Sequence, residues 1–528
     1  MADKRIDVLV IGSGAAGGAL TWRLTEKGVK VVCLEQGGWV EPATMASTQP
    51  NYESQLIRGN WHLDPNIRRR PEDYPVMVEG EYKVNIAMFN AVGGTTIHWQ
   101  GHFPRFHPSD FRVRSLDGIA DDWPITYAEL EPYYDLNDQM VGVSGICGDP
   151  ANPPRSPRQT SPLPLGKLGE TLVGGFEKLG WHWWVSDQAI LSESYKNRPG
   201  CMLHGKCMFG CPIGAKASTD RTYWPISQAK GAEIRPWSRV KEVTVNKQGK
   251  ADGALYFNKA GDLVEIKAKV VVVCCNGIGT PRLLLNSTSK FFPDGLANSN
   301  GMVGRNFMCH PYVFGNGDFD DELDGHIGPM GIPLMSQEFY ESDPKREFVR
   351  GFTLQGERTF GPFSQSMDLP WGKGHHNAFS QRFPHQAGVS AIIDDLPDPN
   401  NRVELSKEQT DSHGIAAAKV TYALTDNTRK QMDFAWEKVQ EVLTAAGGRN
   451  ITRFPLNNGA HLMGTARMGI DKKKSVVNEN NQAHEVKNLF IVDGSSFTTA
   501  AGVNPTSTIM ALALRAADKI WEKRREWN

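Results

Sequence analysis

The sequence predicts an α/β fold in which a parallel, Rossmann-like sheet forms a dinucleotide-binding domain with an inserted α+β region. Three observations support this prediction. An apolar strand at residues 7–11 runs directly into a glycine-rich turn at residues 12–17, and a fully apolar strand recurs at residues 269–273, as in a buried parallel sheet. Residues 312–455 mix strand-like stretches with a helix, before an apolar strand at residues 488–492 returns to the first pattern.

The first part of the chain contains a complete strand–turn–helix–strand unit. Apolar residues recur at helical spacing over residues 19–28, and a second apolar strand follows at residues 29–34. Glu35 stands at the tip of that strand, 23 positions after Gly12. The order and spacing predict dinucleotide binding, and a glycine-rich turn in another kind of α/β protein remains the alternative.

Each residue of this unit suits a phosphate-binding turn. Gly12 permits the tight turn, Gly14 lets the backbone approach a pyrophosphate, and Gly17 lets the helix pack on the strand. The N-terminus of the following helix offers free N–H groups and the positive end of its dipole to the phosphates. Glu35 can accept hydrogen bonds from both ribose hydroxyls.

Length and composition narrow the function classes. A chain of 528 residues exceeds one ordinary core, so two or more subdomains are expected. The net charge of −1, from 58 basic and 59 acidic residues, gives no electrostatic signature of nucleic-acid binding. There is no run of about 18 apolar residues, so no membrane-spanning helix is predicted. Residues 1–5 lead straight into the first strand and leave no room for a signal peptide, so the sequence alone predicts a cytosolic protein.

Three of the eight cysteines cluster in one loop. Cys201, Cys207 and Cys211 have the spacing C-x5-C-x3-C, and nearby glycines let the loop fold around a compact object. Thiolates suit iron–sulfur clusters and zinc, but this spacing is not that of a zinc ribbon. An iron–sulfur cluster is one interpretation; zinc with His204 as a fourth ligand and three unrelated thiols are the alternatives.

Two further turns and the C-terminal segment contain candidate site residues. Paired glycines and threonines in residues 91–99 suit a backbone that runs close to a flat ligand, and Thr280 is predicted to cap a helix that has Pro281 at its first position. The last helix opens near residues 502–508, and its N-terminus can face an anion or a flavin carbonyl. We place His461 and Asn504 opposite a reacting carbon, although a lone histidine is more often structural.

These motifs together resemble the glucose–methanol–choline (GMC) oxidoreductases, flavoproteins that use FAD. Within the family the chain is similar to catalytic subunits of bacterial sugar dehydrogenases that act on glucose, gluconate, fructose or glycosides. Those subunits carry a three-iron cluster on three cysteines with this spacing. One departure is Cys309, where relatives often have Asp. The segments that carry the resemblance are 12–35, 93–94, 122–125, 277–281, 303–306, 461–469 and 493–509.

The resemblance implies which residues hold the cofactors. The implied FAD-binding residues are Gly12, Gly14, Ala15, Ala16, Gly17, Glu35, Gln36, Gly93, Gly94, Thr95, His98, Val240, Asn276, Asp493, Gly494, Asn504, Pro505 and Thr506. Some relatives link FAD covalently through a histidine placed like His98. Cys201, Cys207 and Cys211 are the implied ligands of a 3Fe-4S cluster, and no fourth cysteine lies nearby for a four-iron cluster.

The resemblance also implies a mechanism. A neutral His461 takes a hydroxyl proton as general base, while the hydride of the same carbon passes to N5 of the flavin. Asn504 orients the substrate oxygen. Electrons then leave through the cluster to a cytochrome c-type acceptor. The alternatives are an FAD oxidase or dehydrogenase for a non-sugar alcohol, and a non-catalytic flavin-binding or electron-transfer subunit.

Domain boundaries and location follow from the same resemblance. Residues 1–110, 200–311 and 456–528 are expected to form the FAD-binding domain, with the iron–sulfur loop at residues 200–214. Residues 111–199 and 312–455 are expected to form the substrate-binding and lid regions. In related enzymes a small companion subunit carries the export signal, which implies a place on the periplasmic side of the inner membrane.

Overall fold

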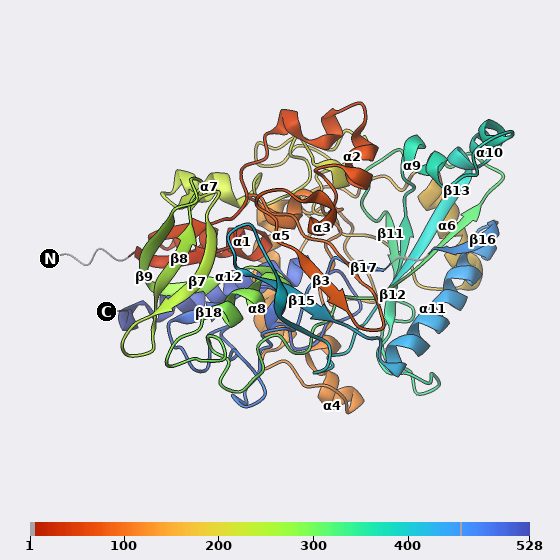
Figure 1. The fold of residues 1–528 in the computed structure, drawn as a ribbon. Coiled ribbons are helices and arrows are strands. Elements are labelled where there is room, and N and C mark those ends of the chain that lie inside the picture. Colours follow the sequence, from red (N-terminus) through yellow and green to blue (C-terminus); the bar gives the residue numbers. More distant parts are fainter. Residues whose placement is uncertain (1–5, 455–456, 528) are drawn as a thin grey trace.

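The computed structural model describes residues 6–454 and 457–527 in two sheet-centred halves that lie side by side (Figure 1). The larger sheet has the order β6-β2-β1-β9-β8-β7, and β18 also pairs with β9. Its strands are β1 (Ile6–Ile11), β2 (Val31–Leu34), β6 (Glu233–Arg235), β7 (Arg239–Val245), β8 (Ala251–Phe257), β9 (Leu263–Val273) and β18 (Leu489–Ile491). β6, β2, β1, β9 and β18 run parallel, as predicted, whereas the first part of β9 forms an antiparallel meander with β8 and β7.

Helices cover both halves of the molecule. They are α1 (Ala15–Glu26), α2 (Tyr52–Arg58), α3 (Pro65–Arg68), α4 (Val113–Asp117), α5 (Tyr127–Val141), α6 (Gly166–Leu179), α7 (Tyr223–Ala229), α8 (Asn276–Asn286), α9 (Pro362–Met367), α10 (His375–Arg382), α11 (Asp426–Ala445) and α12 (Thr506–Glu522). None of the helices in the described ranges is long and apolar enough to cross a membrane.

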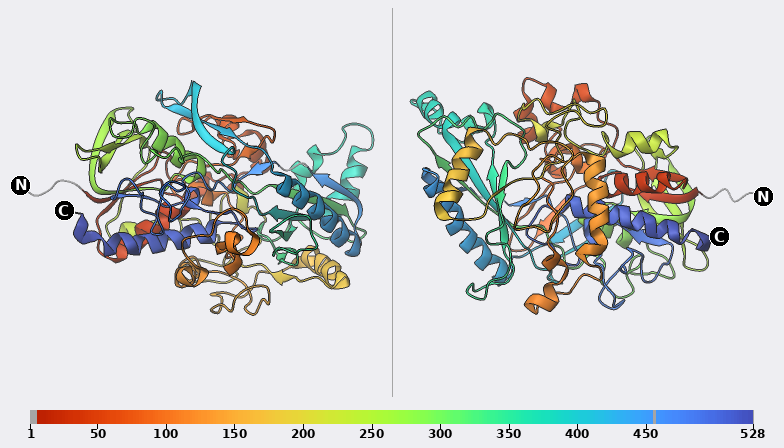
Figure 2. Two further views of the ribbon diagram at one scale, coloured as in Figure 1. Left: turned by 90° about the horizontal axis from the view of Figure 1, so that it is seen from below. Right: turned by 180° about the vertical axis from the view of Figure 1, so that it is seen from behind.

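Both faces of the larger sheet are buried because successive residues of a strand point to opposite sides. Val8 and Val10 of β1 belong to a core with α1 and α12, whereas Leu9 and Ile11 pack with the β7–β9 meander and α8. α1, α12 and α5 lie side by side on one side of the molecule (Figure 2). This packing fixes the carboxyl ends of β1 and β2, where the glycine-rich turn begins.

The second sheet is antiparallel and has the order β16-β10-β13-β12-β11-β5. Its strands are β5 (Trp184–Val185), β10 (Tyr312–Asp318), β11 (Leu334–Ser336), β12 (Phe352–Glu357), β13 (Gln386–Ile393) and β16 (Arg449–Phe454). One face packs against α6 and α11 through residues such as Val313 and Leu354. The other face carries Tyr312, Phe314 and Asn316 of β10, which are only partly buried and line a cavity.

A smaller sheet ties the inserted region to the N-terminal part. β3 (Val76–Glu79) pairs in parallel with β15 (Ala416–Thr421), which also pairs with β14 (Arg402–Thr410). A two-stranded pairing joins β4 (Asn85–Ile86) and β17 (Asn458–Gly459). The inserted region is therefore anchored to the N-terminal part as well as joined to it by the chain.

The predicted start of α8 at Thr280 is wrong. The helix begins four residues earlier, because the side-chain oxygen of Asn276 accepts the backbone N–H groups of Ile278 and Gly279, at 2.9 and 3.1 Å. Pro281 lies inside the helix and lacks the N–H that would bond to the Gly277 carbonyl. That carbonyl instead accepts the Thr465 hydroxyl at 2.8 Å, so the helix tolerates the proline.

Candidate active site

The two halves enclose a cavity of about 710 Å³. Its wall combines the carboxyl ends of β1 and β2, the turn after β9, the first turn of α12 and one face of β10 and β12. The predicted residues in this wall are Gly12, Gly14, Ala15, Ala16, Glu35, Gln36, Gly94, Thr95, His98, Val240, Asn276, His461, Asp493, Gly494, Asn504, Pro505 and Thr506. Gly17, Gly93, Cys201, Cys207 and Cys211 lie outside this wall.

Two glycine turns meet at the floor of the cavity. Gly12 has φ +98°, and a Cβ there would lie 2.4 Å from the carbonyl oxygen of Cys274. A Cβ at Gly94 would lie 2.9 Å from the Cα of Gly14, so neither turn has space for a side chain at this contact. A Cβ at Gly17 would lie 1.9 Å from the Gly12 carbonyl oxygen, which explains how this glycine shapes the turn without lining the cavity.

The Glu35 carboxylate is held in place where the glycine-rich motif predicts the ribose of a bound dinucleotide. It accepts the backbone N–H of Ser13 at 3.0 Å, the Ser13 hydroxyl at 2.7 Å and the backbone N–H of Gly37 at 2.9 Å. Burial raises the pKa of Glu35, and these hydrogen bonds oppose the shift. The carboxylate is thus oriented before any ligand arrives.

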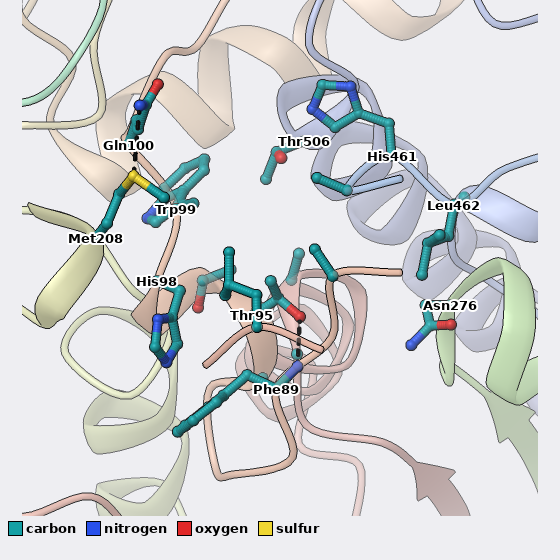
Figure 3. Close-up of a pocket in the computed structure, with 18 of the residues that line it drawn as sticks. Phe89, Thr95, His98, Trp99, Gln100, Met208, Asn276, His461, Leu462 and Thr506 are labelled. Atoms are coloured by element: carbon teal, nitrogen blue, oxygen red, sulfur yellow. Dashed lines mark hydrogen bonds between the residues drawn. The ribbon is translucent and has the colours of Figure 1, made fainter. Parts of the chain in front are cut away.

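Asp493 joins the turn after β9 to the turn after β18. Its carboxylate accepts the Asn276 N–H at 3.0 Å, the Thr280 hydroxyl at 2.6 Å and the Ser495 N–H at 2.7 Å. Burial raises the pKa of Asp493, and its hydrogen bonds to Ser495 and Thr280 oppose that shift. These contacts fix the cavity wall where Asn276 and His461 lie opposite His98 (Figure 3).

A second histidine determines the proton arrangement of His461. Nε2 of His310 lies 3.2 Å from the carbonyl oxygen of Ala500, which can only accept, so His310 carries its proton there. Burial lowers the pKa of His310 to about 4, so the ring is neutral and its Nδ1 has a lone pair. Nδ1 of His461 lies 2.9 Å from that lone pair and must donate to it. Nε2 of His461 is therefore the unprotonated atom.

The orientation of Asn504 is fixed by two donors. Its side-chain oxygen accepts from Nδ1 of His102 at 2.8 Å and from Nε2 of Gln355 at 2.8 Å. Its amide nitrogen therefore points toward Nε2 of His461, at 3.4 Å. The structure brings together the two predicted catalytic residues, which are 43 positions apart, with an unprotonated nitrogen beside an N–H donor.

Burial keeps His461 neutral. Desolvation lowers the pKa of His461 well below 6.5, and His310 and His102 lower it further. Burial likewise lowers the pKa of His102 to about 4. A neutral imidazole with a free lone pair can act as a general base at neutral pH.

Sequence reasoning missed His102 and Gln355 and assigned no role to His310. His102 lies four residues after His98, within the same loop, and could have been noticed there. Gln355 lies on β12 of the other half of the molecule, and no local motif marks it. His310 has φ +52°, a conformation that is uncommon for a residue other than glycine.

His98 lies in an aromatic pocket on the opposite side of the cavity (Figure 3). Its ring centroid is 4.2 Å from that of Phe89 and 4.9 Å from that of Trp61. Neither ring nitrogen has a hydrogen-bond partner among the described residues, and burial lowers the pKa of this histidine well below 6.5. A neutral ring with no partner is compatible both with a bond to the flavin and with packing beside it.

Acid precipitation tests whether FAD is attached at His98. If FAD is attached at His98, yellow colour remains with the precipitated wild-type protein and moves to the supernatant for His98→Ala. Colour in the supernatant of the wild-type protein would exclude the covalent bond. His62→Ala, a half-buried histidine outside the cavity wall, is the control.

The cysteine loop lies next to the cavity. Each of its three sulfurs accepts a backbone N–H: that of Leu203 at 3.4 Å, of Met330 at 3.3 Å and of Lys216 at 3.5 Å, for Cys201, Cys207 and Cys211 respectively. Met208, one residue after Cys207, lines the cavity and accepts from the Gln100 amide at 3.6 Å (Figure 3).

Lys216 ties this loop to the cavity wall. Its ammonium is buried and donates to the carbonyl oxygens of Ile97, Trp99 and Cys207 at 2.7, 2.8 and 2.7 Å. No three His, Cys, Asp or Glu side chains within residues 6–454 and 457–527 converge on a single metal position. The three hydrogen bonds of Lys216 attach the cysteine loop to the turn that carries His98.

Comparisons with known proteins agree with this site. Residues 164–312 and 397–513 match the GMC oxidoreductase family, and residues 7–48 match an FAD binding domain. The chain is 42% identical to 2-methyl-1,2-propanediol dehydrogenase of Mycolicibacterium austroafricanum, over 97% of this chain and 95% of that protein. It is 32% identical to the fructose dehydrogenase large subunit of Gluconobacter japonicus, over 97% of both chains.

Solved structures share the fold. Pyridoxine 4-oxidase from "Mesorbium loti" has a TM-score of 0.66 at 16% identity and covers 98% of this chain and 99% of its own. A structure of formate oxidase has a TM-score of 0.67 at 15% identity and covers 99% of both chains. With the glycine turns, the acid at position 35 and the neutral histidine in one cavity, these relatives identify the chain as a member of the GMC oxidoreductase family, an FAD-dependent enzyme that acts on CH–OH groups.

Proposed function

We propose that the protein is a dehydrogenase that oxidises a hydroxyl of a sugar or glycoside to a carbonyl. The observation that carries this proposal is the arrangement of His310, His461 and Asn504. A neutral imidazole there presents an unprotonated Nε2 beside an amide nitrogen of fixed orientation. This pair can take a proton from a hydroxyl and hold the oxygen that remains.

Residues of the protein itself accept the proton that leaves the substrate hydroxyl. Nε2 of His461 accepts the hydroxyl proton, and its Nδ1 proton stays on the hydrogen bond to His310. The Asn504 amide donates to the substrate oxygen as its negative charge develops, because its own oxygen is already occupied by His102 and Gln355. Bound FAD supplies the acceptor for the hydride of the same carbon.

The substrate class rests on the relatives and on the cavity wall. The names of two relatives, fructose dehydrogenase and gluconate 2-dehydrogenase, refer to polyhydroxylated substrates. The cavity face of the second sheet presents Tyr312, Asn316 and Glu357, which suit a substrate with several hydroxyls. The 42% identity to a dehydrogenase named for a small diol favours the second candidate, oxidation of a non-sugar alcohol.

We further propose that Cys201, Cys207 and Cys211 bind a 3Fe-4S cluster. Each sulfur accepts a backbone N–H, as thiolate ligands of such clusters do. The buried Lys216 and Arg358 and the partly buried Arg198 offset negative charge near the sulfurs. A single zinc ion needs ligands that converge on one point, whereas each cysteine of a three-iron cluster binds its own iron. A bound cluster supplies a one-electron carrier.

A companion subunit and an acceptor complete the proposal. The relative from Gluconobacter is named a large subunit, which supports a small partner for this chain too. We propose that this partner carries the export signal, that the acceptor is a cytochrome c-type protein, and that the complex works on the periplasmic side of the inner membrane. Residue ranges 1–110, 200–311 and 456–528 remain the predicted FAD-binding domain.

Anaerobic bleaching of the flavin by a substrate panel tests the proposed function. We expect fructose, gluconate, glucose or a glycoside to reduce the flavin faster than 2-methyl-1,2-propanediol and simple primary alcohols do. Oxygen should yield little hydrogen peroxide from the reduced enzyme. Faster bleaching by the small diol would favour the second candidate, and rapid peroxide release would identify an oxidase.

A further inference from the structure

A row with two polar side chains crosses the cavity face of the second sheet at Gly388. In the antiparallel register, Gly388 of β13 lies opposite Asn316 of β10 on one side and Glu357 of β12 on the other. Directly opposed residues point to the same face, so the three form one row across the sheet. A Cβ at Gly388 would lie 2.7 Å from the Asn316 side-chain oxygen and 3.3 Å from the Glu357 Cβ. Such a Cβ would also lie 2.9 Å from Cζ of Phe314, so only glycine at position 388 lets the Asn316 and Glu357 side chains pack this closely.

Asn316 and Glu357 retain hydrogen-bonding capacity that no described residue satisfies. One oxygen of Glu357 accepts the Ser390 hydroxyl at 2.6 Å, and no described residue donates to the other. No residue in the described part of the chain forms an ion pair with this carboxylate, and burial raises the pKa of Glu357 to about 7. The Asn316 amide has no hydrogen-bond partner among the described residues, although Asn316 and Glu357 both line the cavity. Both side chains are only partly buried and face the cavity, so a bound ligand can satisfy them.

The position of the row sets the distance to the reacting carbon. Gln355, which holds Asn504, lies two residues before Glu357 on the same face of β12. Two residues of a strand span about 7 Å. The Glu357 carboxylate is therefore too far from Asn504 to touch the hydroxyl next to the reacting carbon, but it can reach one several carbons away.

We propose that Glu357 and Asn316, on either side of Gly388, form a specificity subsite that binds a distal hydroxyl of a polyhydroxylated substrate. This proposal rests on the proposed function. A hydroxyl both donates and accepts, so it can donate to the carboxylate and accept from the amide. An aliphatic chain of the same length would bury both polar groups without partners and is disfavoured.

Two alcohols that differ only in the distal hydroxyl test the subsite: 1,2,6-hexanetriol and 1,2-hexanediol. We expect the wild-type holoenzyme to show the higher kcat/KM for anaerobic flavin bleaching with the triol. Glu357→Leu should lower kcat/KM for the triol by about 10- to 100-fold, the range of one hydrogen bond to a charged group, and leave the diol within about twofold. Glu357→Gln should retain part of the preference, because the amide still bonds to a hydroxyl.

A second variant tests the row without removing the carboxylate. Gly388→Ala places a methyl group 2.7 Å from the side-chain oxygen of Asn316, so the Asn316 amide must move, and the preference for the triol should also fall. The shift of the thermal unfolding midpoint by each alcohol provides a binding measurement that does not depend on turnover. Glu347→Leu, at an exposed glutamate, is the control.

The outcomes separate failure of the subsite from failure of the proposed function. If no sugar or glycoside of the panel bleaches the wild-type flavin, the proposed function fails and the subsite falls with it. If the sugars bleach the flavin but the triol neither bleaches it faster nor stabilises the protein more than the diol, the subsite alone is wrong. If both alcohols bleach the flavin but the ratio of their kcat/KM values is the same in wild type and Glu357→Leu, the subsite is wrong and the proposed function stands. Equal loss with both alcohols would instead make Glu357 a structural or catalytic group and would also overturn the subsite.

Discussion

His461→Ala should retain its FAD and reduce it about 10²- to 10⁴-fold more slowly than wild type, the usual contribution of a positioned general base. The reason is that Nε2 of His461 is the unprotonated nitrogen beside the Asn504 amide. The rate of anaerobic flavin bleaching by substrate is the measurement, because it separates the chemical step from electron export. Asn504→Ala should cost less, since it removes orientation and one hydrogen bond but leaves the proton acceptor.

Two controls test the assignment of His461 as the general base: the pH dependence of the wild-type rate and the variant His310→Ala. Because burial keeps the pKa of His461 well below 6.5, the base remains unprotonated and the wild-type bleaching rate should stay level from about pH 8 to about pH 6. His310→Ala leaves His461 in place but removes the acceptor of its Nδ1 proton. We therefore expect a bleaching rate between those of wild type and His461→Ala. Wild-type bleaching by His461→Ala with its flavin intact would disprove the assignment, and His310 and His98 would be the next candidates.

Cys207→Ser should remove the proposed iron–sulfur cluster while sparing the chemistry at the flavin. Changing a residue that only contacts a metal ligand typically lowers metal affinity roughly 10- to 100-fold. Replacing the proposed ligand Cys207 itself should lower iron affinity by at least as much. We expect iron and labile sulfide to disappear, flavin bleaching by substrate to remain near the wild-type rate, and reduction of a protein acceptor to collapse. Metal analysis and the two rates, measured on one preparation, are the readouts.

An exposed thiol elsewhere controls for the substitution itself. Cys147→Ser changes a cysteine outside the loop and should alter none of the three quantities. Zinc in place of iron and sulfide in the wild-type protein would reject the cluster. Equal loss of flavin bleaching and acceptor reduction in Cys207→Ser would indicate that the loop supports folding, because Cys207 packs in an apolar cluster with Leu163, Ile190 and Met330.

The sequence by itself determined the features that depend on local backbone geometry. The turn around Gly12 and the acid at Glu35 could be predicted because a strand, a tight turn and a helix allow few residue types at these positions. The glycine contacts agree, since a Cβ at Gly12 or Gly17 would collide with the neighbouring backbone. His461 and Asn504 were predicted through the family resemblance, and the structure places both at one cavity.

Only the tertiary structure decided which partners complete the site. Gln355 reaches Asn504 from a strand of the second sheet, and the proton position on His461 depends on His310 and on the Ala500 carbonyl. These contacts join residues far apart in the chain, where no spacing rule applies. The start of α8 was misjudged partly for a local reason, because the side chain of Asn276 caps the helix. The Thr280 hydroxyl instead donates to Asp493, 213 residues away. Side chains in this protein take their roles from neighbours that the fold, and not the chain order, brings together.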